Sequence, residues 1–165
     1  MKINIKQRGL NERKLWRNPR LVQAVEYLLP HALGTPSKDI LDGMSITLLM
    51  RQDRRLISSD TRGKVKFDSP YDSLNCRKYT ITIQKGMGWG QTVKTLAHEL
   101  THVAQYVSGR LRTRFVDGVW VEYWCGLDCG GSNAIPYEER PWEVEARCLE
   151  GPMQDAFFEV EQVGS

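Results

Sequence analysis

The sequence predicts a single α+β domain over residues 1–165, in which a small, mostly antiparallel sheet packs on a long helix. A length of 165 residues fits one domain with one core. Helical and strand patterns alternate along the chain in the order helix, strands, helix, hairpin, helix. Hydrophobic residues make up 41% and charged residues 26% of the chain, which argues against a fibrous, collagen-like or wholly disordered protein.

The first helix is predicted from Pro19 onward. Asn18 can cap it with its side chain, and Pro19 suits the first turn, where its missing N–H needs no partner. Apolar residues then recur at helical spacing up to Pro30, which we expect to end the helix. This spacing gives the helix one face that is directed at a core.

Three strands are expected between this helix and the next one. Residues 45–50 are apolar and β-branched, which is typical of a buried strand, and residues 65–67 form a second, short strand. Residues 79–83 alternate with period two and favour a strand by composition. The basic segment 51–64 is expected to be a hairpin or loop, and segment 68–77 a loop.

The second half of the chain begins with a long helix over about residues 91–108, which Gly109 closes in a left-handed conformation. Residues 111–116 and 119–124 then flank Asp117-Gly118, and this dipeptide between two β-prone runs is a strong signal for a two-residue hairpin turn.

The last part of the chain is predicted to be a loop followed by helix. Segment 125–136 is rich in glycine and is expected to be irregular. Pro141 opens a helix, which we expect to stop near Glu150 because Gly151-Pro152 follows. The tail from Met153 is expected to form one more short helix.

The long helix carries the motif that points to chemistry, His98-Glu99-Leu100-Thr101-His102. Residues four apart lie on one face of a helix, so both imidazoles can approach a single ion. Zinc suits them, because neutral imidazole is a good ligand in tetrahedral sites. Glu99 is placed to take a proton from a zinc-activated water and to pass it to a leaving amine.

The two sides of this helix differ in a way that supports a site. The apolar stripe and the two histidines fall on opposite sides when each residue advances by about 100°. The histidine side is polar but nearly uncharged, with Lys94 as its only charge, so we expect it to be covered as the wall of a cleft is. The predicted inward stripe comprises Val93, Leu96, Ala97, Leu100, Val103, Ala104 and Val107.

A catalytic zinc needs a third protein ligand and one open position. The acidic segment 137–146 is the best source, while His31, which follows a helix-ending proline, is a weaker candidate. Glu143 and Glu145 are about 200° apart on the predicted helix, so only one of them can reach the metal. Periodicity does not choose between them, although the small side chain of Ala146 slightly favours Glu143.

His98-Glu99-x-x-His102 followed by Glu143-x-x-Ala146 resembles the zincin metallopeptidases of the gluzincin type, above all their small versions, which include phage-encoded and prokaryotic proteins. The resemblance covers about residues 79–150. It implies a zincin-like fold with a C-terminal ligand helix, and it implies that Glu143 is the third ligand. Arg147 stands where many relatives have Asp or Asn, so the supporting role of that acid is absent or moved.

The same resemblance implies a zinc-dependent metallopeptidase that hydrolyses a protein or peptide substrate with Glu99 as general base. In such enzymes the strand before the active-site helix is often a sheet edge that pairs with substrate, a role that would fall to residues 79–83. A donor for the developing oxyanion is also needed. Tyr137, Tyr123 and Arg140 are the candidates, of which Tyr137 is taken as the catalytic residue.

A nucleic-acid-associated protease, similar in task to the SprT-like proteins, is the first alternative. The basic segments 1–20 and 51–66 favour it, since residues 1–20 alone carry seven basic side chains and one acidic. Those relatives usually take a third histidine as ligand, however, and none follows His102.

The second alternative is a zinc-stabilised binding protein without turnover, such as a phage factor that acts on a host protein. In that case a fourth ligand such as Cys125 or Cys129 would close the zinc site. The presence of Glu99 counts against it, because a structural site needs no base.

No membrane partner is expected. The longest stretch without Asp, Glu, Lys or Arg is residues 27–37, which is 11 residues and too short to span a bilayer. The first residues also lack the apolar core of a signal peptide. We therefore expect a cytoplasmic protein, located in the host cytoplasm if it is phage-encoded.

Overall fold

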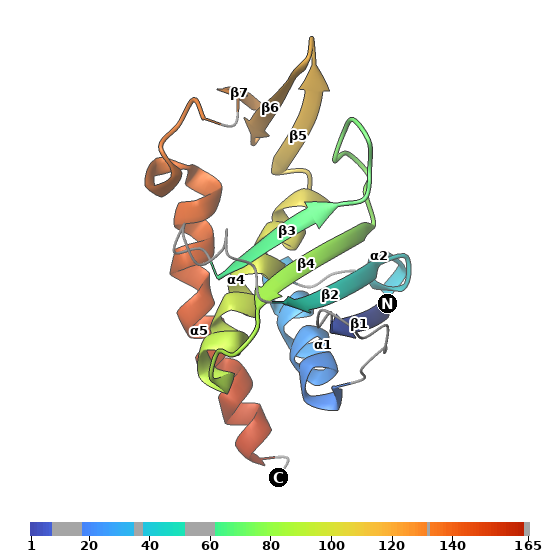
Figure 1. The fold of residues 1–165 in the computed structure, drawn as a ribbon, viewed down its shortest axis with the longest axis vertical. Helices are drawn as coiled ribbons and strands as arrows, with labels where there is room; N and C mark the ends of the chain where they lie inside the picture. The colour runs from blue at the N-terminus through green and yellow to red at the C-terminus, as the bar shows by residue number, and fades with distance from the viewer. Residues whose placement is uncertain (8–17, 35–37, 52–61, 132, 164–165) are drawn as a thin grey trace.

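Figure 1 shows the computed structural model of the chain, which describes residues 1–7, 18–34, 38–51, 62–131 and 133–163. The elements in chain order are β1 (Lys2–Gln7), α1 (Pro19–Leu33), α2 (Lys38–Asp42), β2 (Ser45–Arg51), β3 (Gly63–Phe67), β4 (Lys78–Gln84), α4 (Trp89–Val107), β5 (Leu111–Val116), β6 (Val119–Trp124), β7 (Leu127–Gly131), the 3-10 helix η1 (Tyr137–Glu139) and α5 (Pro141–Val163).

The predicted α+β class is confirmed, and the strands form two sheets. Sheet A has the order β1-β2-β4-β3, in which β1, β2 and β4 are parallel and β3 is antiparallel to β4. Sheet B is the antiparallel array β5-β6-β7. The mostly antiparallel sheet of the prediction thus corresponds to sheet B, while sheet A is mixed because long crossovers allow parallel pairing of its strands.

β1 is a strand that the sequence patterns above do not predict. It pairs in parallel with β2 along its whole length, from Lys2 opposite Ser45 to Gln7 opposite Met50. Its residues alternate between polar side chains and isoleucine, which is a strand pattern, but the run is short and two of its four polar residues are basic. Pairing with the apolar strand β2 decides its conformation.

One hydrophobic core lies between sheet A and the helices (Figure 1). The central helix α4 contacts α1 on one side, α5 on the other and strands β3 and β4 of sheet A. Sheet B extends from the far end of α4, beyond this layered body (Figure 1). α4 is therefore packed on three sides, which fixes the direction of its side chains firmly.

The predictions for α4 are confirmed. The helix spans Trp89–Val107, and Gly109 follows with a φ of +73°, donating its N–H to the carbonyl of Tyr106. The predicted inward stripe is buried from Val93 to Ala104, and Val107 is partly buried. The opposite side is covered too, since Thr95, His102 and Gln105 are also buried.

Two helices continue through prolines that were expected to end them. α1 runs past Pro30 to Leu33, and α5 runs through Gly151-Pro152 to Val163. An interior proline costs about 3 kcal/mol, whereas burying a large apolar side chain contributes roughly 1.5–3 kcal/mol. Beyond Pro152 the helix buries both Met153 and Phe157, so tertiary packing outweighs the local signal to stop.

Two tight turns shape sheet B. The predicted turn Asp117-Gly118 is confirmed, with positive φ at both residues, as a primed two-residue turn requires. Cys125-Gly126 repeats this geometry between β6 and β7, again with both φ values positive. β7 therefore lies inside the segment 125–136 that was expected to be a loop, because a Cys-Gly turn lacks the Asn or Asp that usually marks such hairpins.

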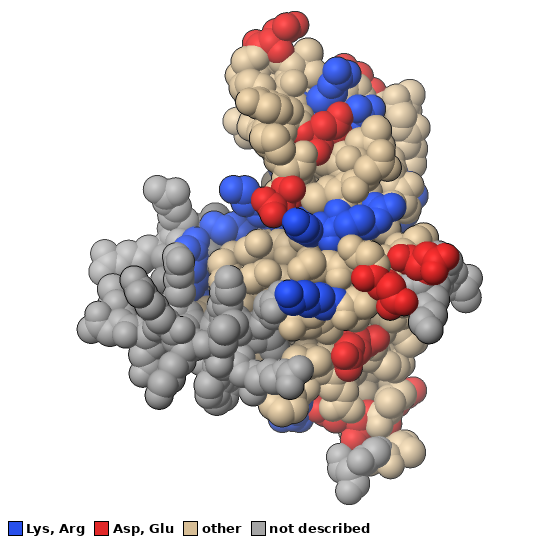
Figure 2. All heavy atoms as spheres, turned by 90° about the vertical axis from the view of Figure 1, so that its right-hand side faces the viewer, with Lys and Arg blue, Asp and Glu red and all other residues tan. Residues whose placement is uncertain are grey.

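The basic segments that raised the nucleic-acid alternative lie largely outside the described residues, namely 8–17 of segment 1–20 and 52–61 of segment 51–66. On the face shown in Figure 2, Lys and Arg side chains form a band across the middle, with Asp and Glu side chains above and below it. The described surface on this face therefore carries both signs of charge. No helix among the described residues is both long enough and apolar enough to cross a membrane.

Candidate metal centre

Two neighbouring helices bring three predicted metal ligands together. α4 carries His98 and His102 on its side toward α5, and the first turn of α5 carries Glu143. The two Nε2 atoms are 3.2 Å apart, and they lie 3.2 and 3.4 Å from Oε2 of Glu143. Among the described residues this is the group of His, Cys, Asp and Glu side chains with the spacing of a metal site.

The three ligand atoms fit a tetrahedral zinc ion. Zn–N and Zn–O bonds of about 2.0–2.1 Å at tetrahedral angles place ligand atoms about 3.3–3.4 Å from one another. The observed separations of 3.2–3.4 Å agree with that value. Two imidazoles and one carboxylate are also the donor types that catalytic zinc takes, with a fourth position left open.

Both imidazoles are held in the orientation that a metal ligand needs. Nδ1 of His98 lies 2.8 Å from Oε2 of Glu150, and Nδ1 of His102 lies 2.8 Å from Oε1 of Gln105. Because these oxygens accept a hydrogen bond from Nδ1–H, each Nε2 keeps its lone pair and points at Glu143. The site is thus prepared for Nε2 ligation on both histidines.

The structure distinguishes the two candidate glutamates. Glu145 turns away from the cluster and joins a partly buried chain of hydrogen bonds: it accepts from Nε2 of Gln105 at 2.8 Å and from Nη1 of Arg110 at 2.5 Å. Gln105 also donates to the carbonyl oxygen of Trp142 at 3.0 Å. Glu143 is therefore the glutamate placed as the third candidate ligand, while Glu145 holds the amide of Gln105 that contacts His102.

Glu150 has a role that sequence reasoning missed. It lies seven residues after Glu143 on α5 and so falls on the same face two turns later. Glu150 contacts Nδ1 of His98 and pairs with Nζ of Lys94 at 3.4 Å, so it can support the imidazole although Arg147 carries no acid. The seven-residue spacing between Glu143 and Glu150 is the sequence signal that could have indicated this role.

We expect Glu150→Gln to lower zinc affinity by about 10- to 100-fold, because the amide is a weaker partner for the Nδ1–H of His98. Competition with a chromogenic chelator measures this affinity. Glu159→Gln is the matched control, since Glu159 is exposed on the same helix. Equal affinities in the two variants would show that Glu150 does not support the ligand.

Glu99, the candidate acid–base residue of the motif, is buried beside the three candidate ligands. Glu99 is 4% exposed, and burial raises the pKa of its carboxyl to about 7 against the opposing charges of His102 and His98. For Glu143 in the metal-free chain, burial acts in the same direction, but when the imidazoles also carry protons at Nε2, hydrogen bonds from His102, His98 and Tyr137 hold the pKa of its carboxyl well below the usual range. The two carboxyls therefore differ in basicity: Glu99 is suited to proton transfer and Glu143 to ligation.

β3 approaches Glu99 so closely that only glycine fits at its first residue. A Cβ on Gly63 would lie 2.6 Å from Oε1 of Glu99 and 2.8 Å from Cγ2 of Thr95. The backbone of β3 thus covers the base and holds its side chain in place.

Gly63→Ala is therefore expected to displace Glu99 and to destabilise the fold by about 1–3 kcal/mol, the usual cost of overpacking. Urea unfolding measures this change. Gly151→Ala, where nothing lies within 4 Å of the new Cβ, is the control and should be neutral or slightly stabilising. The same behaviour in both variants would contradict the close approach.

The predicted edge strand is the wrong one. Residues 79–83 belong to β4, which lies between β2 and β3 and is therefore an interior strand. β3 takes the edge position in the described sheet. At the two ends of this pairing, Gln84 donates its N–H to the carbonyl of Arg62, and Asp68 donates its N–H to the carbonyl of Lys78. Every second residue of an antiparallel strand bonds to its partner strand, so the residues between these positions alternate. The N–H and C=O groups of Gly63, Val65 and Phe67 therefore point away from β4, to the free edge.

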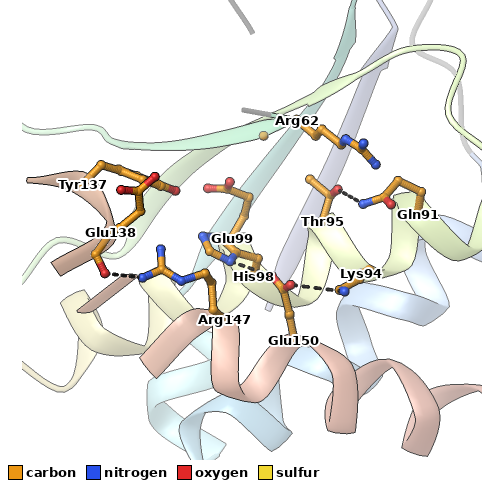
Figure 3. Close-up of a pocket in the computed structure, with 11 residues that line it drawn as sticks. Arg62, Gln91, Lys94, Thr95, His98, Glu99, Tyr137, Glu138, Arg147 and Glu150 are labelled. Atoms are coloured by element: carbon orange, nitrogen blue, oxygen red, sulfur yellow. Dashed lines mark hydrogen bonds and ion pairs between the residues drawn. The ribbon is translucent and has the colours of Figure 1, made fainter. Parts of the chain in front are cut away.

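A cleft passes over the ligand cluster and has two arms. The larger arm has a volume of about 410 Å³ and the smaller one about 190 Å³, and both are bordered by Gly63, His98, Glu99 and Tyr137. Figure 3 shows the larger arm, with the Glu99 carboxylate pointing into it between Tyr137 and Thr95. His98 and Glu99 thus border both arms, whereas His102 borders the smaller arm.

The candidates for an oxyanion donor separate in the structure. Tyr137, on η1, borders both arms of the cleft and hydrogen-bonds to Glu143 through its hydroxyl. Arg140 borders the smaller arm, where its Nε donates to the carbonyl of Ile135 at 3.1 Å. Tyr123 borders neither arm, since its neighbour Glu122 takes the cleft-facing position on β6. Tyr137 is the best placed of the three.

The cysteines do not join the ligand cluster within the described part of the chain. Cys125 is exposed in the turn between β6 and β7, and Sγ of Cys129 contacts the carbonyl of Leu127 at 3.6 Å. His31 lies apart too, stacked on Tyr27 with ring centroids 4.2 Å apart. Among the described residues the candidate ligand group thus consists of His98, His102 and Glu143.

No protein-family model, curated protein or solved structure matches this chain. The gluzincin resemblance therefore depends on the two motifs and on the geometry of the residues within them.

Proposed function

We propose that this chain is a zinc-dependent metallopeptidase. His98, His102 and Glu143 would hold the zinc ion, and Glu99 would act as general base. The observation that carries the proposal is the separation of 3.2–3.4 Å between the three ligand atoms, next to a buried glutamate that no ligand role requires. When bound, zinc supplies Lewis acidity, which acidifies water and polarises a carbonyl group.

Glu99 carries out both proton transfers of peptide hydrolysis in this proposal. Glu99 takes a proton from the attacking water as the oxygen adds to the scissile carbonyl carbon, and then passes that proton to the amide nitrogen as the C–N bond breaks. The products are a carboxylate and an amine. The burial of Glu99 beside the three ligand residues suits it to both the acceptance and the return of the proton, because bulk water does not compete for its carboxylate.

Other groups of the cleft would position the peptide. The free edge of β3 offers the N–H and C=O groups of Gly63, Val65 and Phe67 to an extended peptide. Hydrogen bonds between two backbones do not depend on the side chains, so this pairing would not select a particular peptide sequence. The hydroxyl of Tyr137 would turn from Glu143 to donate a hydrogen bond to the developing oxyanion. Glu150 and Gln105 would keep the imidazoles aligned throughout.

Metal analysis combined with a peptidase assay tests this function. We expect about one zinc ion per purified chain. Cleavage of an unfolded protein or a mixed peptide library should disappear on chelation and return when zinc is restored. Full zinc occupancy without cleavage of any peptide would instead support the binding protein without turnover.

A further inference from the structure

The smaller arm of the cleft contains a carboxylate that neither the zinc site nor the proton transfer uses. This is Glu122, on β6, directly opposite Thr113 of β5. Side chains alternate along a strand, so Glu122 shares its face with Trp120 and Trp124, and this face is turned toward α4 and the ligand cluster. The carboxylate therefore points into the space beside the predicted zinc ion.

Glu122 is partly buried and has no hydrogen bond or ion pair within the described part of the chain. Burial raises the pKa of its carboxyl against the opposing charge of Arg140, and the charge of Glu143 raises it further. Arg140 is the nearest cation, but its Nε donates to a backbone carbonyl and its guanidinium lies over the ring of Tyr137. A half-buried carboxylate without a direct partner is costly, and a cation from outside would compensate it.

The walls of this arm suit the stem of a long side chain. They include Val65 of β3, the rings of Tyr106 and Trp142, and the buried side chain of Leu111, and the charged residues Lys64 and Arg140 also line the arm. The ligand residues border the same arm, so its volume of about 190 Å³ includes the metal position, and the part near Val65 and Glu122 has room for a single side chain of a substrate. Apolar walls with a carboxylate among them match a lysine or arginine, whose methylene stem packs while its charge finds a partner.

Further aromatic rings pack behind Tyr106, which lines the arm. Phe67, at the end of β3, contacts Trp120 of β6 with ring centroids 6.0 Å apart, and it contacts Tyr106 at 5.5 Å. A peptide paired with the edge of β3 alternates its side chains, so one of them would enter the arm next to Val65 while the backbone continues outside.

We propose that Glu122 is the specificity-determining residue of the peptidase and that the smaller arm binds a lysine or arginine side chain of the substrate, close to the scissile bond. This inference rests on the proposed function, because it assigns the substrate class of the same cleft. An amino terminus would bring a charge but no stem to fill the apolar walls, and a neutral side chain would leave the carboxylate without a partner.

Cleavage of an N-acetylated peptide library by the zinc-loaded protein, with products identified by mass spectrometry, tests the inference. We expect lysine and arginine to be enriched at one position beside the cleaved bond. Glu122→Gln should lower kcat/KM for a lysine peptide by about 10- to 100-fold relative to its norleucine analogue, as loss of a charge-assisted hydrogen bond predicts. Glu159→Gln, at an exposed site on α5, should retain the wild-type preference.

A binding measurement separates this inference from the proposed function. The inactive Glu99→Gln variant should bind the lysine peptide more tightly than the norleucine peptide by a similar factor, and adding Glu122→Gln should remove the difference. Thermal melting and zinc content confirm that each variant is folded.

Cleavage that shows no basic preference, a preference that survives Glu122→Gln, or a preference confined to peptides with a free amino terminus would each overturn the assignment of Glu122. Absence of any cleavage by the wild-type protein would overturn the proposed function. The binding comparison between the lysine and norleucine peptides would then still decide whether Glu122 recognises a cation.

Discussion

Glu99→Gln is expected to lower kcat/KM for peptide hydrolysis by about 10²- to 10⁴-fold, the usual contribution of general acid–base catalysis. Glutamine has the shape of glutamate but accepts no proton, so the attacking water would lose its base and the leaving amine its acid. Glu99 is not among the ligand atoms, so zinc content should stay at the wild-type level. Steady-state kinetics on one peptide, with metal analysis of the same sample, measures both.

Glu159→Gln provides the control for this experiment, because it makes the same chemical change at an exposed site of α5. Its kcat/KM should equal that of the wild type. If Glu99→Gln kept full activity at full zinc occupancy, Glu99 would not be the base. If the variant lost zinc as well, its low activity would reflect loss of the metal, and the expectation that Glu99 takes no part in zinc binding would be wrong.

His98→Ala, His102→Ala and Glu143→Ala are each expected to lose the stabilisation that zinc confers on the folded chain. A ligand at 1,000 times its dissociation constant stabilises the native state by about 4 kcal/mol. For a chain of this length that corresponds to a rise in Tm of about 8–16 °C. Thermal unfolding with excess zinc and with chelator measures the difference, which should be near zero in the three variants.

Glu145→Gln is the informative comparison. Glu145 is the alternative third ligand, two residues from Glu143 in the sequence, but its carboxylate binds Gln105 and Arg110. This variant should keep most of the zinc-dependent rise in Tm, with a weaker affinity because the support of His102 is reduced. A complete loss in Glu145→Gln together with a full response in Glu143→Ala would reverse the ligand assignment.

The motif His98-Glu99-x-x-His102 could be predicted with its geometry because helix periodicity is a local property. The 3.6-residue repeat places the two imidazoles on one side and the apolar stripe on the other, whatever the rest of the chain does. The turn Asp117-Gly118 was predictable for the same reason, since positive φ at both positions depends on those two residues alone. Both predictions are confirmed.

Features that depend on distant packing were missed or left open. The choice between Glu143 and Glu145 could not be made from periodicity, because both flank the inward stripe of α5. The rotation of α5 against α4 decides it, bringing Glu143 and then Glu150 to the histidines. The continuation of α5 past Pro152 likewise depends on the burial of Phe157 in the core.

The edge strand shows the same division. A run of alternating residues predicts that 79–83 form a strand, but its place in the sheet depends on which other strands pair with it. β3, short and flanked by charge, proves to be the edge, and its first residue, Gly63, approaches Glu99. The cleft-facing position of Glu122 likewise follows from the pairing of β6 with β5.

The α+β class, the two histidines with their glutamate, and the helix face on which the histidines lie could be predicted from the sequence, because each follows from backbone periodicity over a few residues. The third candidate ligand, the partners of both imidazoles, the edge strand beside Glu99 and the carboxylate in the smaller arm became clear from the folded structure alone. These depend on contacts between residues some forty or more positions apart, such as His98 with Glu150, and packing between whole elements sets them.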